Sequence, residues 1–256
     1  MNTEKSSTIL LSNDDGVFSE GIKALINAMR PLGNIFVVAP DGGRSGMGCS
    51  VTSQIPVRAQ LIQSEPNLTV YTCTGTPVDC IKLALGNLMP QKPDLIVAGI
   101  NHGSNESINV HYSGTMGIAI EGALNKIPSI GFSLCNYSPE ADFSQAAQYA
   151  NIISRKILKM NFPAGICLNV NIPDIQHIKG IKICRQSNGV WSEEFEQRTD
   201  PHGFAYYWLT GTMQYPEKEY IDTDKYALAN GYVSIVPCKI DVTAHEQIET
   251  FSRLFL

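Results

Sequence analysis

The chain has 256 residues, of which 43% are hydrophobic and 17% charged, so it can bury the core of one ordinary globular domain. Its 19 Lys and Arg residues against 24 Asp and Glu give a formal charge of −5, which disfavours general electrostatic binding to a nucleic acid polymer or an anionic membrane. The longest apolar runs fall far short of the roughly 20 residues that span a bilayer. We expect no membrane span and no signal peptide.

Seven cysteines are spread along the chain without a C-x-x-C pair. An odd number at irregular spacing fits neither a disulfide framework nor a zinc site. Most of the cysteines stand in apolar segments, where a thiol packs as a small hydrophobic group. The pattern predicts reduced cysteines and a cytoplasmic protein.

Three short and continuous apolar runs predict strands that are buried on both faces, as in a parallel sheet. These runs are Thr8–Ser12, Ile35–Ala39 and Leu95–Gly99. Between the first two, apolar residues recur at helical spacing from Ile22 to Met29, and Gly33 follows as a helix stop signal. This segment therefore predicts a strand, a helix and a second strand in one right-handed crossover.

The next segments continue the alternation of strands and helices. The predicted elements are buried helices at Val78–Leu88 and Thr115–Leu124, a strand at Ile127–Leu134 and an amphipathic helix at Ala146–Met160. The expected fold class is α/β, with a Rossmann-like doubly wound, mostly parallel sheet formed by about residues 1–174.

Beyond about residue 174 the sequence no longer follows this alternation. Segments 178–186, 204–211 and 231–241 resemble strands, and residues 187–224 are rich in Gly, Pro, aromatic and charged residues. The end, Ala244–Leu256, predicts a short helix whose apolar face would need a covering partner. We predict a single domain over residues 1–256, in which about 175–256 form a C-terminal β-hairpin arm and a tail for oligomerisation.

Polar residues follow each of the three predicted buried strands. The first strand ends in Asn13-Asp14-Asp15-Gly16, the second in a loop that contains Ser45, and the third in Asn101. Ligands bind beyond the carboxyl ends of the strands in such sheets. Adjacent carboxylates repel each other unless a cation or a proton lies between them. Hard oxygen donors favour Mg²⁺ or Mn²⁺, although Asn, Asp and Gly are also ordinary turn residues.

A fourth polar segment precedes the predicted helix at Thr115–Leu124. Tyr112-Ser113-Gly114-Thr115 would place hydroxyl and N–H groups at a helix N-terminus, where phosphate binds favourably. Ser113 or Thr115 is equally suited to be the N-cap residue, and the two roles are compatible. The glycine-rich stretch at 42–48 is not a P-loop, because Cys49-Ser50 follows where Lys and Ser or Thr would stand.

The ordered motifs resemble those of the SurE family of survival-protein nucleotidases. They are ILLSNDDG, VVAP-D-x-x-RSG, GTPVDC, PDLIVAGIN-x-G-x-N, YSGT, YYW and GYVSI-x-P, from about residue 8 to 245. The resemblance implies metal-dependent hydrolysis of nucleoside 5′- and 3′-monophosphates, with short polyphosphate as a further substrate in some members. It also implies a cytoplasmic homodimer or homotetramer and one divalent metal ion, Mg²⁺ or Mn²⁺, per subunit.

The resemblance also implies roles for individual residues. The metal ligands fall on Asp14, Asp15, Ser45 and Asn101. The contacts to the substrate phosphate fall on Asn13, Gly46, Asn105, Ser113, Gly114 and Thr115. Asp14 or Asp15 is then the catalytic residue that orients or deprotonates the attacking water. His102 and His111 are expected to be solvated or structural loop residues rather than proton donors.

Two other functions use the same residues. A phosphatase for a non-nucleotide ester would differ only in its substrate. A non-catalytic nucleotide sensor would use the phosphate site without turnover, but a pure anion binder would avoid the Asp14-Asp15 pair because carboxylates repel phosphate. Phosphate release from a panel of esters separates these functions.

Overall fold

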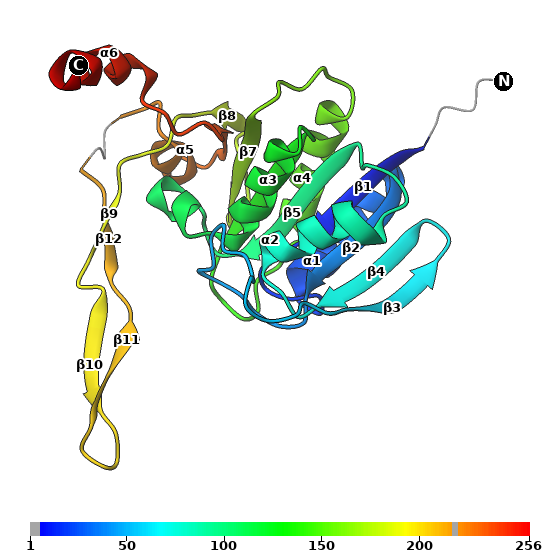
Figure 1. The fold of residues 1–256 in the computed structure, drawn as a ribbon, viewed down its shortest axis with the longest axis horizontal. Helices are drawn as coiled ribbons and strands as arrows, with labels where there is room; N and C mark the ends of the chain where they lie inside the picture. The colour runs from blue at the N-terminus through cyan, green and yellow to red at the C-terminus, as the bar shows by residue number, and fades with distance from the viewer. Residues whose placement is uncertain (1–5, 217–219) are drawn as a thin grey trace.

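The computed structural model describes residues 6–216 and 220–256. In this part of the chain a nine-stranded sheet has the order β3-β4-β2-β1-β5-β6-β7-β13-β8, with helices on both faces (Figure 1). Its strands are β1 Ser7–Ser12, β2 Gly33–Pro40, β3 Ala59–Glu65, β4 Leu68–Cys73, β5 Leu95–His102, β6 Ser129–Cys135, β7 Ile166–Pro173, β8 Ile181–Ile183 and β13 Val233–Lys239. The pairs from β4 through β2, β1, β5 and β6 to β7 are parallel. The predicted mostly parallel α/β sheet is confirmed.

The helices divide between the two faces of the sheet. They are α1 Glu20–Met29, α2 Pro77–Leu83, α3 Gly114–Leu124, α4 Ser144–Ile157, α5 Asp224–Ala229 and α6 Ile248–Phe255. On one face, α1 packs on β1, which points Ile9 and Leu11 to this side, and α4 packs on β5 and β6, while Leu10 points to the opposite face, toward α2 and α3. Both faces of β1 are therefore buried, which explains its continuous apolar sequence.

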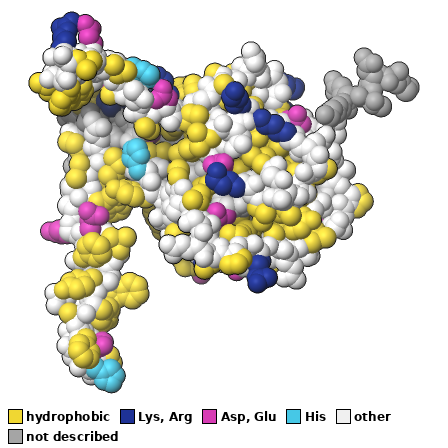
Figure 2. Space-filling model, in the orientation of Figure 1, with side chains coloured by type: hydrophobic (Ala, Val, Ile, Leu, Met, Phe, Trp, Pro, Cys, Tyr) yellow, Lys and Arg dark blue, Asp and Glu magenta, His cyan; other side chains and the backbone are white. Residues whose placement is uncertain are grey.

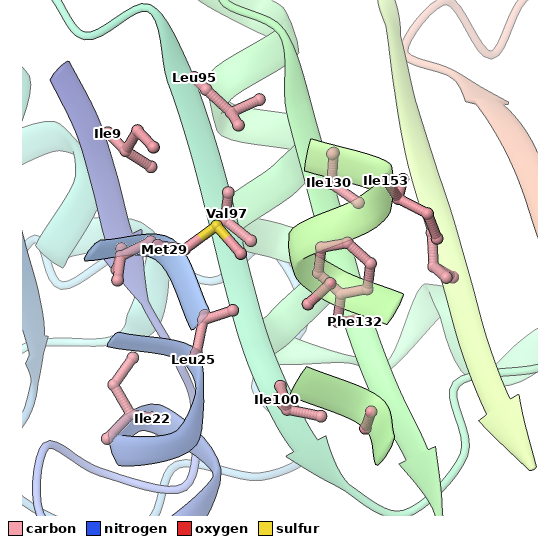
Figure 3. Packing of buried hydrophobic residues seen from close by; sticks show 14 of the residues in the cluster. Ile9, Ile22, Leu25, Met29, Leu95, Val97, Ile100, Ile130, Phe132 and Ile153 are labelled. Atoms are coloured by element: carbon pink, nitrogen blue, oxygen red, sulfur yellow. The ribbon is translucent and has the colours of Figure 1, made fainter. Parts of the chain in front are cut away.

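The largest core cluster is filled by long side chains from the sheet and from α1 and α4. Figure 3 shows Leu25 and Met29 of α1 pointing toward Val97 on β5, and Phe132 of β6 lying near Ile153 of α4. Leu25, Met29 and Phe132 are fully buried. Each such side chain contributes about 2 kcal/mol by leaving water. This packing fixes the carboxyl ends of β1 and β5 relative to each other.

Gly33 follows the helical stretch as predicted, but its φ of 164° is extended backbone and not a left-handed helix cap. Helix α1 ends at Met29, a 3₁₀ turn follows at Arg30–Leu32, and Gly33 is the first residue of β2. A Cβ atom at Gly33 would lie 2.1 Å from the carbonyl oxygen of Ser7. This glycine is therefore required by the close approach of β2 to β1 rather than by a helix end.

The C-terminal region contains the predicted hairpins. Its arm consists of β9 Val190–Ser192, β10 Phe195–Thr199, β11 Ala205–Leu209 and β12 Thr212–Gln214, and it projects away from the sheet (Figure 1). Hydrophobic side chains gather along this arm (Figure 2), among them the exposed Phe204, Tyr207 and Trp208. The predicted terminal helix is present as α6, where Phe251 and Phe255 are exposed. Among the described residues, no helix combines the length and the apolar character that crossing a bilayer requires.

Candidate functional site

The site lies at the carboxyl edge of the sheet, where the strand order reverses. Strand β1 pairs with β2 on one side and with β5 on the other. The chain first builds the sheet outward through β2 and β4, and it then returns to β1 through β5. This is the switch point at which α/β sheets bind ligands. The predicted polar segments after β1, β2 and β5 therefore meet at one edge.

Asp14 is the central residue of this edge. Its side chain is 3% exposed, and the Thr115 hydroxyl donates to Asp14 Oδ1 at 2.6 Å. The same hydroxyl lies 3.4 Å from Asn101 Oδ1. Thr115 thus brings the end of β1 and the end of β5 together, and two of the residues predicted as metal ligands lie side by side.

The first turn of α3 lies directly against Asp14. A Cβ atom at Gly114 would be 2.8 Å from Asp14 Cβ and 3.0 Å from its Oδ2. Burial raises the pKa of Asp14, while the hydroxyl of Thr115 and the amide N–H groups of Thr115 and Gly114 counteract part of that rise. The positive end of the helix therefore supports the ionised carboxylate. Ser113 is the N-cap of α3, since its Oγ accepts a bond from Met116 N at 3.1 Å.

Asp15 faces the end of β5. Its Oδ2 accepts a hydrogen bond from the backbone N–H of His102 at 3.2 Å. Burial, followed by repulsion from Asp14, raises the pKa of Asp15 from 3.8 to about 6. Burial therefore raises the pKa of both adjacent carboxyl groups, and a cation bound between them would favour their ionised forms.

The loop after β2 is held against the same edge by its backbone. Arg44 N donates to Asp14 O at 2.6 Å, and a Cβ atom at Gly16 would lie 3.1 Å from the backbone of Gly42. Ser45 and Gly46 are exposed, and Gly46 has a φ of 78°. Ser45 and Gly46 thus follow the residue that is bound to the backbone of Asp14, in a loop that is accessible to solvent.

Asn13 supplies an acceptor without a partner. Its Nδ2 donates to Gly16 O at 2.9 Å and to Ser19 Oγ at 2.8 Å. Its Oδ1 is buried and has no hydrogen-bond partner. A buried acceptor left unpaired costs free energy, so this atom is suited to accept from a bound group.

The donor set fits a hard divalent cation. Asp14 and Asp15 supply carboxylate oxygens, and Asn101 adds an amide oxygen beside Asp14. Among the described residues, no group of three His, Cys, Asp or Glu side chains is arranged to hold a metal. A metal at this edge would therefore depend on two carboxylates completed by neutral oxygen donors, which are ligands that Mg²⁺ and Mn²⁺ accept.

Asn105 lies in a separate buried network. Its Nδ2 donates to Ser133 Oγ at 2.8 Å, and its backbone N–H donates to Asn171 Oδ1 at 2.8 Å. Asn169 Nδ2 in turn donates to the carbonyl oxygen of Asn105 at 2.8 Å. The contacts described for Asn105 are with β6 and β7, and the aspartates are not among them.

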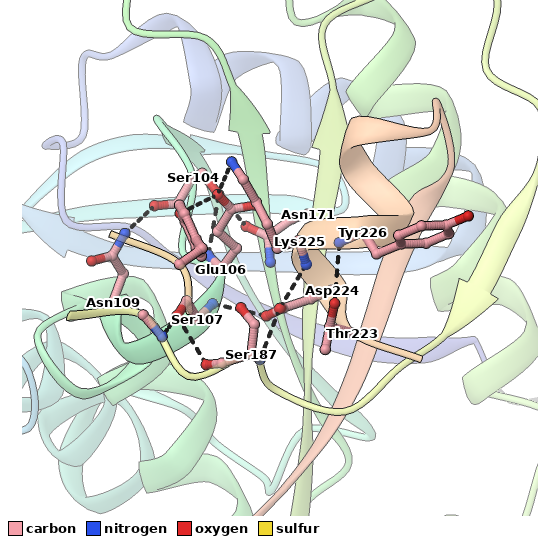
Figure 4. Close-up of polar contacts among 12 residues, drawn as sticks. Ser104, Glu106, Ser107, Asn109, Asn171, Ser187, Thr223, Asp224, Lys225 and Tyr226 are labelled. Carbon is pink, nitrogen blue, oxygen red and sulfur yellow. Dashed lines mark hydrogen bonds and ion pairs between the residues drawn. The ribbon is translucent and has the colours of Figure 1, made fainter. Parts of the chain in front are cut away.

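Sequence reasoning did not identify a buried acidic residue that joins three segments near this network. Asp224 is fully buried and accepts bonds from Ser107 N at 2.8 Å and Ser187 N at 3.0 Å. Figure 4 shows these contacts beside Glu106 and Lys225. The Thr223 hydroxyl caps α5, accepting from Tyr226 N at 3.2 Å. The Thr223-Asp224 pair could have been recognised in the sequence as the start of a helix, but the sequence does not reveal the distant residues that Asp224 binds.

The two histidines have different surroundings. His102 is the last residue of β5 and not a loop residue as predicted, because β5 extends three residues beyond Gly99. Its Nε2 lies 2.6 Å from Ser138 O, a contact that gives the ring a structural role. His111 ends a short 3₁₀ helix over Ser107–His111.

Comparison with known proteins agrees with this fold. The model of the family described as survival protein SurE matches residues 9–193. The "5'-nucleotidase SurE" of Phocaeicola vulgatus is 52% identical over 237 residues, or 93% of this chain and 92% of that protein. The protein of the same name from Bacteroides thetaiotaomicron is 53% identical over 247 residues, 96% of this chain and 95% of that one. The crystal structure of the SurE protein from Aquifex aeolicus is 37% identical, covers 96% of this chain and 99% of its own, and has a TM-score of 0.82. The chain belongs to the survival protein SurE family.

Proposed function

We propose that this chain is a metal-dependent phosphomonoesterase that hydrolyses nucleoside 5′- and 3′-monophosphates to nucleoside and phosphate, and that also accepts short polyphosphate. Relatives named 5'-nucleotidase that are about half identical over nearly the whole chain support the nucleotidase activity. The observation that carries the mechanism is the adjacent Asp14-Asp15 pair at the switch point of the sheet, with Asp14 buried beside Asn101 and the N-terminus of α3. The free cysteines are in keeping with a cytoplasmic enzyme.

One divalent ion per subunit, Mg²⁺ or Mn²⁺, would be held by Asp14, Asp15, Ser45 and Asn101. Such an ion supplies positive charge for a phosphoryl oxygen and lowers the pKa of a water molecule. Asp14 or Asp15 orients that water or accepts its proton. Thr115 holds Asp14 beside Asn101 through its hydroxyl. The open Ser45 loop leaves room for the ester to enter.

The remaining predicted residues receive the phosphate. We assign this role to Asn13, Gly46, Asn105, Ser113, Gly114 and Thr115. Asn13 Oδ1 accepts from a protonated phosphate oxygen or a bound water, since it has no partner within the described residues. The N-terminus of α3 stabilises negative charge at the reacting group as well as on Asp14.

A panel of phosphate esters tests this function. Phosphate release is measured from 5′- and 3′-nucleoside monophosphates, ribose 5-phosphate and tripolyphosphate, with Mg²⁺, Mn²⁺ or EDTA. We expect metal-dependent release from the mononucleotides that EDTA abolishes. Release confined to ribose 5-phosphate or tripolyphosphate would keep the site but reject the nucleotide substrate. Nucleotide binding without any release would identify a sensor instead.

We also propose that the arm and tail make the protein a homodimer or homotetramer. The exposed residues Ile248, Phe251 and Phe255 of α6 lie on a short helix of strongly one-sided hydrophobicity, and the arm exposes further aromatic rings. Apolar surfaces of this kind are covered in soluble proteins. A chain that ends at residue 240 should therefore be monomeric or aggregate. Light scattering measures this, and an unaltered dimer would show that the tail takes no part in assembly.

A further inference from the structure

A cavity opens beside Asn105, two strands away from the aspartates. Its volume is about 520 Å³. Ser104 and Glu106, the neighbours of Asn105 in sequence, both line it. The rest of its wall comes from Asn109, from the ends of β6 and β7 with the residues that follow them, from α5, and from the root of the arm. The mechanism above uses none of these lining residues.

An ion pair between the buried Glu106 and the partly exposed Lys225 forms one wall of this cavity. Glu106 is 7% exposed, and its Oε1 accepts bonds from Tyr215 OH at 2.8 Å and from Lys225 Nζ at 3.1 Å. Lys225 Nζ also lies 4.4 Å from the centroid of the Tyr215 ring. Both bonds to Glu106 use Oε1, which leaves Oε2 to accept from a ligand. Figure 4 shows Glu106 and Lys225 lying close together.

Three aromatic side chains also line the cavity. The indole Nε1 of Trp191 donates to Asn109 Oδ1 at 3.0 Å, which fixes the ring at the root of the arm. Tyr137 packs on Gly103, where a Cβ atom would lie 2.2 Å from the ring, yet Tyr137 remains 71% exposed. Together with Tyr215, these rings surround a space that the fold itself does not fill. Flat rings at the wall of a polar cavity are suited to stacking on a planar ligand.

The position of the cavity identifies its occupant. Neighbouring strands lie about 5 Å apart, so the ends of β6 and β7 stand roughly 5–10 Å from the end of β5, where Asn101 meets Asp14. Ser104 and Glu106 follow Asn101 by three and five residues, so the loop after β5 runs from the aspartate edge to the cavity. A phosphate ester with a planar group one sugar away from its phosphorus would span this separation, whereas inorganic phosphate would not.

We propose that this cavity is the nucleoside subsite, in which Trp191, Tyr215 and Tyr137 stack on the base and Glu106 Oε2 accepts from a base N–H or a ribose hydroxyl. The proposal rests on the proposed nucleotidase function and adds to it the residues that select a base. Two of the three rings belong to elements outside the parallel part of the sheet, since Trp191 lies on β9 and Tyr215 directly follows β12. The arm therefore contributes to substrate choice.

The first test compares a substrate that has a base with one that lacks it. We expect Trp191→Ala to lower kcat/KM for AMP about tenfold through KM, and to leave ribose 5-phosphate hydrolysis unchanged, since base stacking is worth at least about this factor. Trp191→Phe should restore most of the loss. Trp208→Phe is the matched control, because it removes the chain's other tryptophan, which lies on β11 outside the cavity, and keeps an aromatic ring on the arm. An equal loss for both substrates, or no loss for AMP, would overturn the subsite.

The second test does not depend on turnover. In a Trp208→Phe variant, Trp191 is the single tryptophan of the chain, and adenosine added in EDTA should quench its fluorescence while ribose should not. If the wild-type protein hydrolyses no nucleotide but adenosine still quenches, the proposed function fails and the nucleoside site stands. If AMP is hydrolysed and adenosine leaves the fluorescence unchanged, the nucleotidase function stands and the subsite is refuted.

Discussion

Replacing Asp14 by Asn should lower kcat/KM for nucleoside monophosphates by about 10³-fold or more. The substitution removes one of the two carboxylates that would hold the metal, and it removes a candidate base for the attacking water. The fold should be kept, because an Asn side chain can still accept the 2.6 Å bond from the Thr115 hydroxyl. Steady-state phosphate release measures the loss, and calorimetric titration with Mn²⁺ measures the accompanying loss of metal affinity.

Asp142→Asn is the matched control for this substitution. This substitution removes the same charge as Asp14→Asn, but at an exposed position. The Asp142 carboxylate accepts bonds from the N–H and hydroxyl of Ser144 at the start of α4. Activity of this variant should stay close to that of the wild type. Turnover of Asp14→Asn within about threefold of the wild type would refute the assignment of Asp14, since losing a residue that stabilises the transition state lowers turnover by a much larger factor.

The parallel strands β1, β2 and β5 could be predicted because burial on both faces requires continuous apolar runs in the sequence. The runs at β1, β2 and β5 are continuous and apolar, and the predicted strands lie within the observed ones. Strand β3, Ala59–Glu65, was missed because it is an exposed edge strand with a polar sequence. Strand β4 was missed because threonines and a tyrosine interrupt its apolar residues. Strand β7 was missed because Asn169 and Asn171 interrupt its apolar run, and only the folded sheet shows that both amides bond to the loop around Asn105 or to each other.

Some residues of the candidate site could be predicted for a different reason. The rule that parallel strands end at one edge brings Asp14, Asp15 and Asn101 together without knowledge of any contact. The role of Thr115 as a bridge between Asp14 and Asn101 depends on where α3 packs, which no local pattern gives. Asp224 and Lys225 were missed because each is an ordinary charged residue in sequence, and the partners that their side chains bind in other segments lie 37 to 119 positions away.

In the absence of metal, replacing Asp15 by Asn should stabilise the protein at neutral pH. The pKa of Asp15 is raised from 3.8 to about 6 by burial and by repulsion from Asp14. Above pH 6 the folded state therefore carries a charge whose unfavourable environment costs on the order of 1–3 kcal/mol. Removing that charge should raise the free energy of unfolding in EDTA by a comparable amount, as measured by urea denaturation at one fixed protein concentration.

The direction of the pH dependence follows from the same shift. Because the folded-state pKa is the higher one, the neutral form of Asp15 stabilises the wild-type fold at pH 4, and this contribution is lost as the pH rises through about 6. The advantage of Asp15→Asn should therefore be largest at pH 7 and should shrink toward pH 4. Asp142→Asn should show no such gain, because hydrogen bonds from Ser144 lower the pKa of Asp142. Adding Mn²⁺ should reverse the order at pH 7 by stabilising the wild type alone. If Mn²⁺ stabilises both proteins equally, Asp15 is not a metal ligand, and the raised pKa reflects burial without a cation to offset it.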